Sequence, residues 1–285
     1  MTLFKQLTKN TLPVTHVRHQ PGQPTLEVRD LSVRYDQLKA LVGITFSLKP
    51  GERIAVVGPN GAGKSTLFKA IAGIQPYSAG EVKIYGHGPG GHTCIAYLPQ
   101  RSQVDWNFPA SVADVVMMGR VSNLGPLRWP KASDWEFVRR CLQVVDLAEL
   151  EKRQIGELSG GQQQRMFIAR ALAQEAELML MDEPFTGLDV PSQDGILSIL
   201  EQLRPREVTV LASTHDLNLA SERFDQVLLL NRRQLGFGPA SEIFTTERLL
   251  EAYGGHLRLI EDGQQLVALG DTCCDDEGGQ HEHLA

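Results

Sequence analysis

The stretch GPNGAGKST, residues 58–66, constrains this chain more than any other feature of its sequence. It fits the P-loop pattern, with Gly58, Gly63, Lys64 and Ser65 in place. Glycines let backbone N–H groups turn inward around phosphate oxygens, the lysine places a charge on the β- and γ-phosphates, and the serine hydroxyl is offered to Mg²⁺. The apolar run RIAVVG precedes the stretch, so we predict a buried strand, a phosphate-binding turn and a helix in succession.

Other apolar runs extend this pattern into a fold. ELMLMD (177–182), VTVLAST (208–214) and VLLL (227–230) are typical of buried parallel strands, and helical stretches separate them. Alternation in LEVRDLSVRY and GITFSL indicates half-buried antiparallel strands. Residues 101–157 carry helical signals, including capping-box-like starts at Ser111 and Ser133, and no strand signal. We therefore predict an α/β fold: a P-loop NTPase core with an antiparallel β subdomain and an inserted helical subdomain.

Composition sets the domain limits and excludes some functions. We predict a flexible leader at 1–24, one domain at 25–255 that contains the P-loop and the helical subdomain at about 101–157, and an extension at 256–285. The net charge of −6 is concentrated in the tail, because residues 261–285 hold seven Asp and Glu and no Lys or Arg. A body close to neutral argues against a nucleic-acid partner. No run of 18 apolar residues and no signal-peptide pattern occurs, so we expect a cytoplasmic chain.

Two acidic residues supply the complement to the P-loop. The run ELMLMDEP predicts a buried strand that ends in Asp182, with Glu183 directly after it. Near a phosphate site, Asp182 is expected to hold Mg²⁺ through water and Glu183 to polarise the attacking water.

LSGGQQQR, residues 158–165, is expected to open a helix. Ser159 and the two glycines after it place open backbone N–H groups at a positive helix end, which makes a second anion site.

Taken in order, these motifs resemble the ABC-type ATPases over about residues 25–255. The order is the P-loop, a glutamine ending a strand (Gln100), LSGGQ, the Asp-Glu pair, GLD (187–189) and a histidine after a strand (His215). Tyr35 lies upstream, where the family places an aromatic that stacks on adenine.

The resemblance implies a role for each motif. It implies an ATPase, with ATP as substrate and Mg²⁺ as cofactor. The signature of one subunit would cover the γ-phosphate held by another, so that two complete sites need a homodimer. The residues implied are Glu183, His215 and Gln100 in catalysis; Tyr35, Gly58, Pro59, Asn60, Gly61, Ala62, Gly63, Lys64, Ser65 and Thr66 in ATP binding; Ser65, Gln100 and Asp182 at Mg²⁺; Ser159, Gly160, Gly161 and Gln162 in the signature; and Asp189 between the subunits.

The kind of ABC protein follows from what surrounds these motifs. The chain carries a single module, and only about 95 residues separate Lys64 from Ser159, which leaves no room for a long coiled coil. This favours the separate ATPase subunit of a membrane importer. The phrases PQRSQVDWNFPASVADVVMMGR and GPASEIFTTERLLEAYGG (238–255) are similar to the ATPases of manganese, zinc and iron importers.

The predicted function is therefore to energise a membrane permease for uptake of a divalent metal ion. An extracellular or periplasmic metal-binding protein is the indirect partner, and the site of action is the cytoplasmic face of the membrane. Two alternatives stay open: an importer for another solute, and a regulatory ATPase that grips a protein partner.

The sequence leaves the roles of three groups of residues open. Trp106 and Phe108 either anchor a coupling helix of the permease or lie in the core of the helical subdomain. The tail offers metal-ligand types between acids, so a regulatory metal site competes with a solvated acidic tail. His87 and His92 are interpreted as turn residues. The tail ligands are Cys273, Cys274, His281 and His283.

Overall fold

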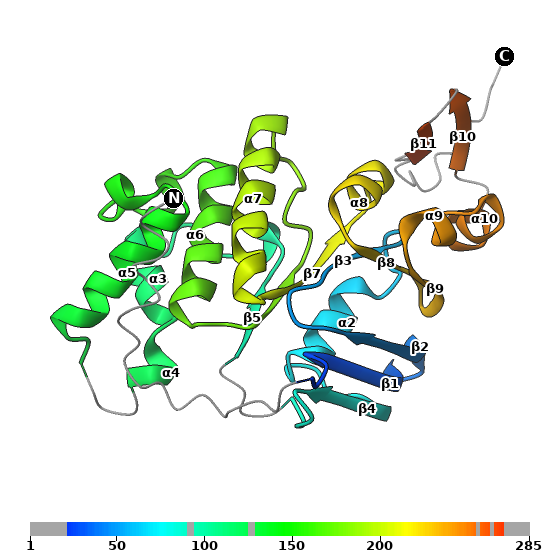
Figure 1. Ribbon diagram of the computed structural model, residues 1–285, viewed down its shortest axis with the longest axis horizontal. Coiled ribbons are helices and arrows are strands. Elements are labelled where there is room, and N and C mark those ends of the chain that lie inside the picture. Colours follow the sequence, from blue (N-terminus) through cyan, green and yellow to red (C-terminus); the bar gives the residue numbers. More distant parts are fainter. Residues whose placement is uncertain (1–21, 90–93, 125–128, 255–256, 263–264, 271–285) are drawn as a thin grey trace, which may run out of the picture.

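A computed structural model of the chain describes residues 22–89, 94–124, 129–254, 257–262 and 265–270. Its main feature is one nine-stranded sheet with the order β4-β1-β2-β9-β8-β3-β7-β6-β5 (Figure 1). The strands are β1 (Leu26–Tyr35), β2 (Leu38–Leu48), β3 (Arg53–Val57), β4 (Ala79–Ile84), β5 (Ile95–Leu98), β6 (Leu178–Met181), β7 (Thr209–Thr214), β8 (Gln226–Asn231) and β9 (Arg233–Gly238).

The sheet has a parallel part and an antiparallel part. Strands β8, β3, β7, β6 and β5 pair in parallel, whereas β4, β1 and β2 pair antiparallel. β9 joins the two parts, because it runs antiparallel to β8 and makes a parallel pair with β2. This arrangement confirms the predicted α/β fold with an antiparallel β subdomain.

Strand β3 explains why the central strands are continuously apolar. Its residues alternate between two cores: Ile54 and Val56 pack on the side of α2, and Ala55 and Val57 pack on the side of the other helices. A strand covered on both faces has no polar face, so it does not show the alternation of a half-exposed strand.

Helices cover both faces of the parallel part. Figure 1 shows α3, α5, α6 and α7 gathered at one end of the molecule and α2 against the antiparallel strands. The helices are α2 (Lys64–Ile71), α3 (Val112–Met118), α4 (Val121–Leu124), α5 (Ala132–Val144), α6 (Gly160–Ala173), α7 (Val190–Leu203), α8 (Leu217–Arg223), α9 (Ala240–Ile243) and α10 (Thr246–Tyr253), with 3₁₀ turns at Arg101–Gln103, Ala148–Leu150, Ile155–Glu157 and Arg204–Arg206.

Two helix starts were predicted inside the region 101–157, and one was wrong. Ser111 caps α3 as expected, and its hydroxyl accepts the N–H of Asp114 at 3.2 Å. The second helix starts earlier than Ser133. The carboxylate of Asp134 accepts the Lys131 N–H at 2.9 Å, and this bond places the beginning of α5 just after Lys131.

The chain beyond α10 forms a small separate hairpin. Strands β10 (Leu257–Asp262) and β11 (Gln265–Gly270) pair with each other, and β11 lies near α8. The predicted metal ligands of the tail and most of the predicted leader lie outside the described residues, as does His92. His87 lies in a turn, where its N–H bonds to the carbonyl of Ile84 at 3.0 Å. Within the described residues, no helix is long and apolar enough to cross a bilayer.

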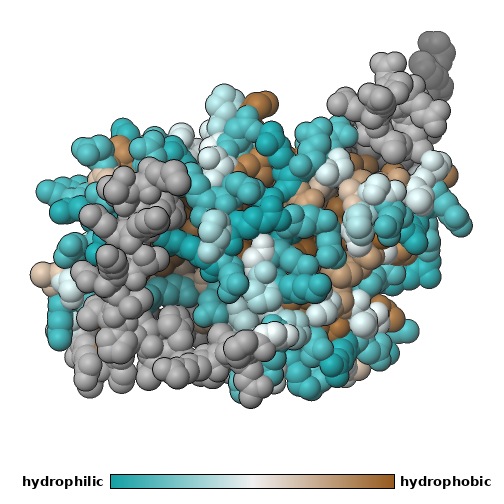
Figure 2. Space-filling view, viewed as in Figure 1, coloured by the Kyte–Doolittle hydropathy of each residue, from teal (hydrophilic) through white to brown (hydrophobic). Residues whose placement is uncertain are grey.

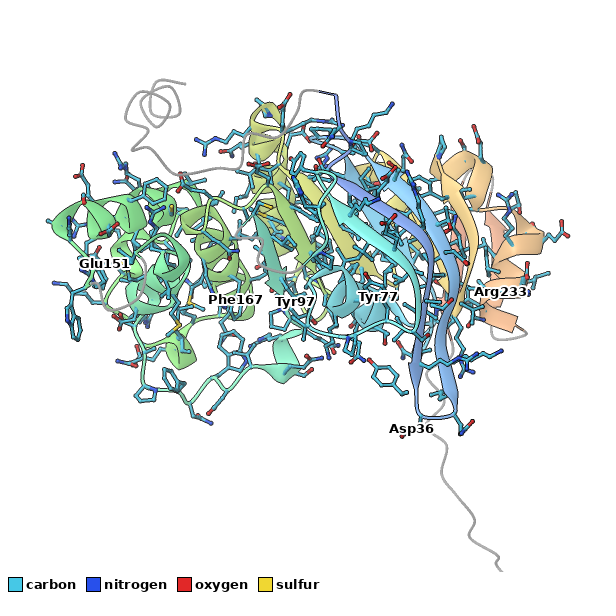
Figure 3. The ribbon with its side chains drawn as sticks, turned by 90° about the horizontal axis from the view of Figure 1, so that it is seen from below. Asp36, Tyr77, Tyr97, Glu151, Phe167 and Arg233 are labelled. Atoms are coloured by element: carbon cyan, nitrogen blue, oxygen red, sulfur yellow. The ribbon has the colours of Figure 1, made fainter. Side chains whose placement is uncertain are left out.

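The outer surface follows this layering. Figure 2 shows mostly hydrophilic residues over α5, α6 and α7, whereas hydrophobic residues gather around α8 and β8. In the antiparallel part of the sheet, Figure 3 shows the β1–β2 hairpin projecting beyond its neighbours, with Asp36 at its turn.

Candidate active site

The predicted phosphate loop connects the end of β3 to the start of α2. Lys64 is 6% exposed, and its Nζ donates hydrogen bonds to the carbonyl oxygens of Gly58 at 2.6 Å and Pro59 at 3.1 Å. Burial lowers the pKa of Lys64, and the charges of Glu183 and Asp182 oppose that shift. The lysine therefore lies close to both acidic residues. Its positive charge and the two carboxylates can act on the same bound ligand.

Three glycines of the loop are needed for three different reasons. A Cβ on Gly58 would lie 2.0 Å from the carbonyl oxygen of Leu230, so the close approach of β8 excludes a side chain. Gly63 has a φ of +97°, and a Cβ there would lie 2.6 Å from Leu41 Cδ2. Gly61 has a φ of +75° and open space around it, so only its backbone conformation favours glycine.

The first turn of α2 is built to receive an anion. Gly63 is its N-cap and provides no side-chain cap, so no side chain of the cap competes for the first N–H groups. Ser65 and Thr66 follow in that turn and are partly exposed. The loop residues Asn60 and Gly61 are exposed, while Ala62 is buried and its carbonyl accepts the N–H of Arg232 at 2.8 Å.

Adjacent parallel strands bring the distant motifs together. β3 pairs with β7 and β7 pairs with β6, so the P-loop, the Asp-Glu pair and His215 all follow the carboxyl ends of neighbouring strands. This edge of an open α/β sheet is where ligands bind in such folds.

Asp182 is held by two neighbouring strands. It is 2% exposed, and it accepts hydrogen bonds from Ser213 Oγ at 2.9 Å and from the Tyr97 hydroxyl at 3.4 Å. Burial raises the pKa of Tyr97, and the charge of Asp182 raises it further, so the phenol stays a donor. Neither Ser213 nor Tyr97 was predicted as a site residue, although Ser213 begins the STHD stretch before His215.

Glu183 occupies a constrained position. Its φ is +50°, which is uncommon for a residue with a side chain, and its N–H donates to Ser213 Oγ at 2.8 Å. Its Oε2 accepts Gln100 Nε2 at 2.8 Å and Thr186 Oγ1 at 3.4 Å. The backbone and the carboxylate of Glu183 are thus both oriented, as a residue that positions a water molecule would need. Thr186 is a further contact that the sequence did not indicate.

Two other predicted residues, His215 and Tyr35, make no hydrogen bond to this centre among the described residues. His215 is exposed and lines a hollow of about 150 Å³ with Ser213, Thr186 and Gly187. Tyr35 ends β1 and is 39% exposed. Among the described residues, neither His215 nor Tyr35 makes a hydrogen bond or ion pair to Glu183 or Lys64, and their assigned roles stay predictions.

The signature starts α6 in a reciprocal cap. Ser159 Oγ accepts the Gln162 N–H at 3.3 Å, and Gln162 Oε1 accepts the Ser159 N–H at 2.9 Å. A Cβ on Gly161 would lie 2.7 Å from Ser192 Oγ of α7, so α7 packs closely against this turn. Asp189 is the exposed N-cap residue of α7. No hydrogen bond or ion pair among the described residues joins the signature to the P-loop.

Trp106 and Phe108, whose exposure the sequence left open, behave differently. Trp106 is partly buried, donates its indole N–H to the Arg101 carbonyl at 3.0 Å and packs edge-on to Phe167 of α6 at 5.8 Å. Phe108 is 52% exposed. Trp106 thus belongs largely to the packing of the helical region, whereas the ring of Phe108 is exposed.

The α/β fold, with the P-loop and the Asp-Glu pair at the carboxyl ends of neighbouring parallel strands, defines a P-loop nucleotide-hydrolysing protein. Residues 41–186 match the family described as ABC transporter. The chain belongs to that family, as one of its ATP-binding subunits.

Individual relatives agree with this assignment. The chain is 48% identical over 247 residues to the manganese transport system ATP-binding protein MntB of Halalkalibacterium halodurans. This match covers 86% of this chain and 98% of that protein. It is 45% identical to the chelated iron transport system membrane protein YfeB of Yersinia pestis (84% of this chain and 82% of that protein covered) and 44% identical to the zinc transport system ATP-binding protein TroB of Treponema pallidum (81% and 88%).

Among solved structures, the chain resembles an ABC transporter of the metal-chelate type in an inward-facing conformation. The TM-score is 0.73 at 31% identity, with 86% of this chain and 96% of that chain covered.

Proposed function

We propose that this chain is the ATP-hydrolysing subunit of an importer for a divalent metal ion, with manganese, zinc or iron as the cargo. The observation that carries this proposal is the acidic centre beside the P-loop, where Gln100 and Ser213 orient Glu183 close to Lys64. The cargo class is supported by relatives 44–48% identical whose names give those metals.

The reaction follows from these positions. Glu183 accepts a proton from the attacking water, while Gln100 and Thr186 keep its carboxylate directed at that water. Lys64 and the first turn of α2 stabilise the negative charge that develops on the transferred phosphoryl group. His215, at the neighbouring strand end, contacts the γ-phosphate in this proposal.

Mg²⁺ fits the donor set of the site. Ser65 offers a hydroxyl, Asp182 a buried carboxylate and Gln100 an amide oxygen, and oxygen ligands of this kind suit Mg²⁺. As placed, Gln100 uses its amide nitrogen for Glu183, which leaves its oxygen available. When bound, the ion neutralises phosphate charge.

Two chains form the complete catalytic unit in this proposal. The cap of α6 and the P-loop do not bond to each other within the described residues of one chain, and each has the form of a phosphate site. A two-fold homodimer places Ser159, Gly160, Gly161 and Gln162 of one subunit over the nucleotide of the other, with Asp189 between the subunits. Tyr35 stacks on the adenine.

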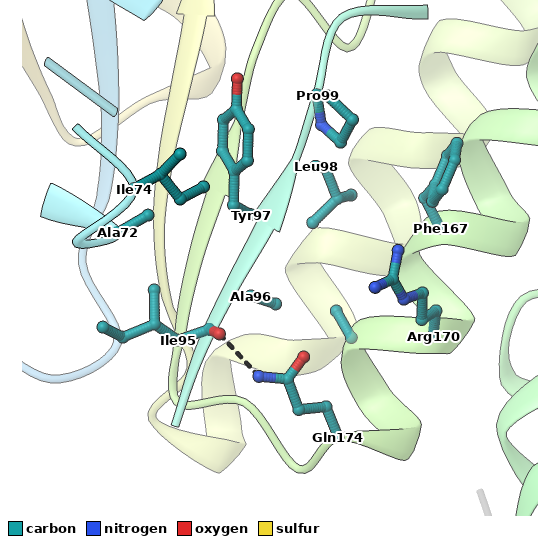
Figure 4. A pocket seen from close by; sticks show the side chains of 11 residues that line it. Ala72, Ile74, Ile95, Ala96, Tyr97, Leu98, Pro99, Phe167, Arg170 and Gln174 are labelled. Carbon is teal, nitrogen blue, oxygen red and sulfur yellow. Dashed lines mark hydrogen bonds between the residues drawn. The ribbon is translucent and has the colours of Figure 1, made fainter. Parts of the chain in front are cut away.

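In this proposal the permease docks in a groove next to this site. Figure 4 shows the residues that line a groove around strand β5, between the end of α2 and helix α6. The groove has a volume of about 380 Å³. Ile74, which is 60% exposed, and Tyr97 lie on the α2 side of β5, and Phe167 lies on the α6 side. Arg170, half buried in the same groove, makes no side-chain hydrogen bond or ion pair to the described residues. Apolar walls with one unpaired guanidinium suit an amphipathic segment that carries a carboxylate.

The proposed location follows from this partner. The chain acts peripherally on the cytoplasmic face of the membrane, bound to the permease. A metal-binding protein outside the membrane delivers the cargo and has no contact with this chain.

Uptake measurements test the proposal. Cells that lack this chain are given radioactive manganese or zinc, with wild type or Glu183→Gln restored. We expect wild type alone to restore uptake of one metal. Restoration of neither metal would contradict the cargo, and restoration by both proteins would contradict the role of Glu183.

A further inference from the structure

Arg101 directly follows Gln100 and bonds to a different part of the molecule. Gln100 Nε2 reaches Glu183 at 2.8 Å, whereas Arg101 Nε donates to Gln163 Oε1 at 2.6 Å. Gln163 lies in the first turn of α6 and is 3% exposed, and its Nε2 donates to the Ile155 carbonyl at 3.3 Å. Two consecutive residues thus connect the acidic centre with the start of the signature helix.

The guanidinium of Arg101 also lies against the signature itself. A Cβ on Gly160 would lie 2.8 Å from Arg101 Nη1 and 3.1 Å from Leu188 Cδ2. Leu188 is the residue before Asp189. Arg101 therefore stands where three segments meet: the strand end that carries Gln100, the first glycine of the signature and the segment that leads to Asp189.

Trp106 holds Arg101 from the other side. Its indole N–H donates to the Arg101 carbonyl at 3.0 Å, and the guanidinium carbon lies 6.0 Å from its ring centroid. Trp106 packs in turn on Phe167 of the same helix α6. Although Arg101 is an exposed residue, these contacts restrict its side chain to one arrangement.

We propose that Arg101 is a positioning residue that couples the two ATP sites of the dimer. The inference rests on the proposed function, in which Glu183 acts on the chain's own nucleotide and the signature acts on the nucleotide of the other subunit. A shift of Gln100 at one site moves Arg101, and Arg101 moves the first turn of α6 through Gln163 and Gly160. The arginine touches neither nucleotide, so its effect is on cooperativity and not on the chemical step.

The test compares Arg101→Met, Gln163→Leu and the double variant in the purified full chain. Steady-state ATP hydrolysis gives the Hill coefficient. ATP affinity and ATP-driven dimerisation are measured separately with non-hydrolysing Glu183→Gln versions of the same variants. We expect each single variant to lower the Hill coefficient toward one and to weaken ATP-driven dimerisation about fivefold or more, a coupling of ordinary allosteric size. The double variant should lower the Hill coefficient little further than either single variant, because the Arg101–Gln163 bond is already removed in each of them.

Arg139→Met is the matched control, because Arg139 is an exposed arginine of the helical region that pairs with Glu151 at 3.0 and 3.1 Å. It should leave the Hill coefficient and dimerisation unchanged. Unchanged cooperativity in both single variants, or fully additive losses in the double variant, would overturn the inference. If Glu183→Gln does not dimerise with ATP even when Arg101 is present, the proposed homodimer fails instead.

Discussion

Ser213 shows what a single side chain does at the candidate site. It joins Asp182 and the backbone of Glu183, so one hydroxyl on β7 fixes two acidic residues on the neighbouring strand end. Its only signal in the sequence is its place before His215. The bond spans 31 positions of the chain and depends on the pairing of β6 with β7, which a local pattern does not specify.

We expect Ser213→Ala to lower kcat about tenfold or more, because loss of a supporting hydrogen bond lets Glu183 leave its productive orientation. The KM for ATP should change little, since Lys64 and the P-loop are untouched. Steady-state kinetics on the purified chain provide the test. Ser221→Ala is the control, because the Ser221 hydroxyl donates only to the nearby Asn218 carbonyl within the part of the chain that the structure describes. An equal loss in both variants would contradict this role.

Glu183 and Lys64 should separate catalysis from binding. Glu183→Gln keeps the size of the side chain but removes the base, so we expect hydrolysis to fall at least about 100-fold with ATP affinity retained. Lys64→Ala removes the charge at the phosphates and should weaken ATP binding itself. Calorimetric titration with ATP distinguishes the two, and normal affinity in Lys64→Ala would contradict the phosphate cradle.

At the scale of elements, the loop between β3 and α2 is positioned by its fit against β8. Gly58 has no room for a Cβ, whereas Gly61 has open space and only an unusual φ. We expect Gly58→Ala to lower the free energy of unfolding by about 3 kcal/mol or more, because backbone must move, and Gly61→Ala by about 1 kcal/mol. Denaturant unfolding of both variants measures the difference, and equal losses would show that β8 does not set this constraint.

The elements that a sequence predicts best are those with strong local patterns. The P-loop and the apolar runs of β3, β6, β7 and β8 fall where they were predicted, because a doubly covered strand needs an unbroken apolar run. Strand β9 was missed, because it contains glycines and polar residues and shows no clear period. Strand β5 was expected only through the family resemblance, which places Gln100 at a strand end, because four residues at the edge of the sheet are too few to show a period.

Two buried thiols, Cys94 directly before β5 and Cys141 in α5, can report on local opening of these elements. Cys94 and Cys141 are buried, and burial raises the pKa of Cys94 to about 11 and that of Cys141 to about 12. The reactive thiolate is therefore scarce in the folded chain, and we expect both to react with a thiol reagent only after unfolding, even when the pH rises from about 7 to about 9. Mass spectrometry of labelled peptides checks this. Fast labelling of Cys141 in the native protein would show that α5 opens locally.

At the scale of the whole molecule, the chain presents an open groove and an exposed aromatic on the side of its helical region. Phe108 lies two residues beyond Trp106, whose ring packs on Phe167 in the wall of the groove that holds Arg170. The sequence left both aromatics open between an exposed anchor and the core of the helical subdomain, and it did not distinguish the packed ring from the exposed one. Exposure depends on where α6 lies relative to the 3₁₀ turn after Gln100, and that is a tertiary property.

We expect Phe108→Ser and Arg170→Met to uncouple the ATPase from its permease. An exposed aromatic anchor and an unpaired guanidinium contribute to binding only when a partner covers them, so each loss should weaken association about 30-fold or more. Co-purification of the permease with tagged variants measures association, and ATP hydrolysis by the chain alone should stay near wild type. Leu250→Ser is the matched control, because Leu250 is 46% exposed on α10, away from the groove. Association lost equally in the control would mean that surface hydrophobicity in general, and not this side of the molecule, holds the permease.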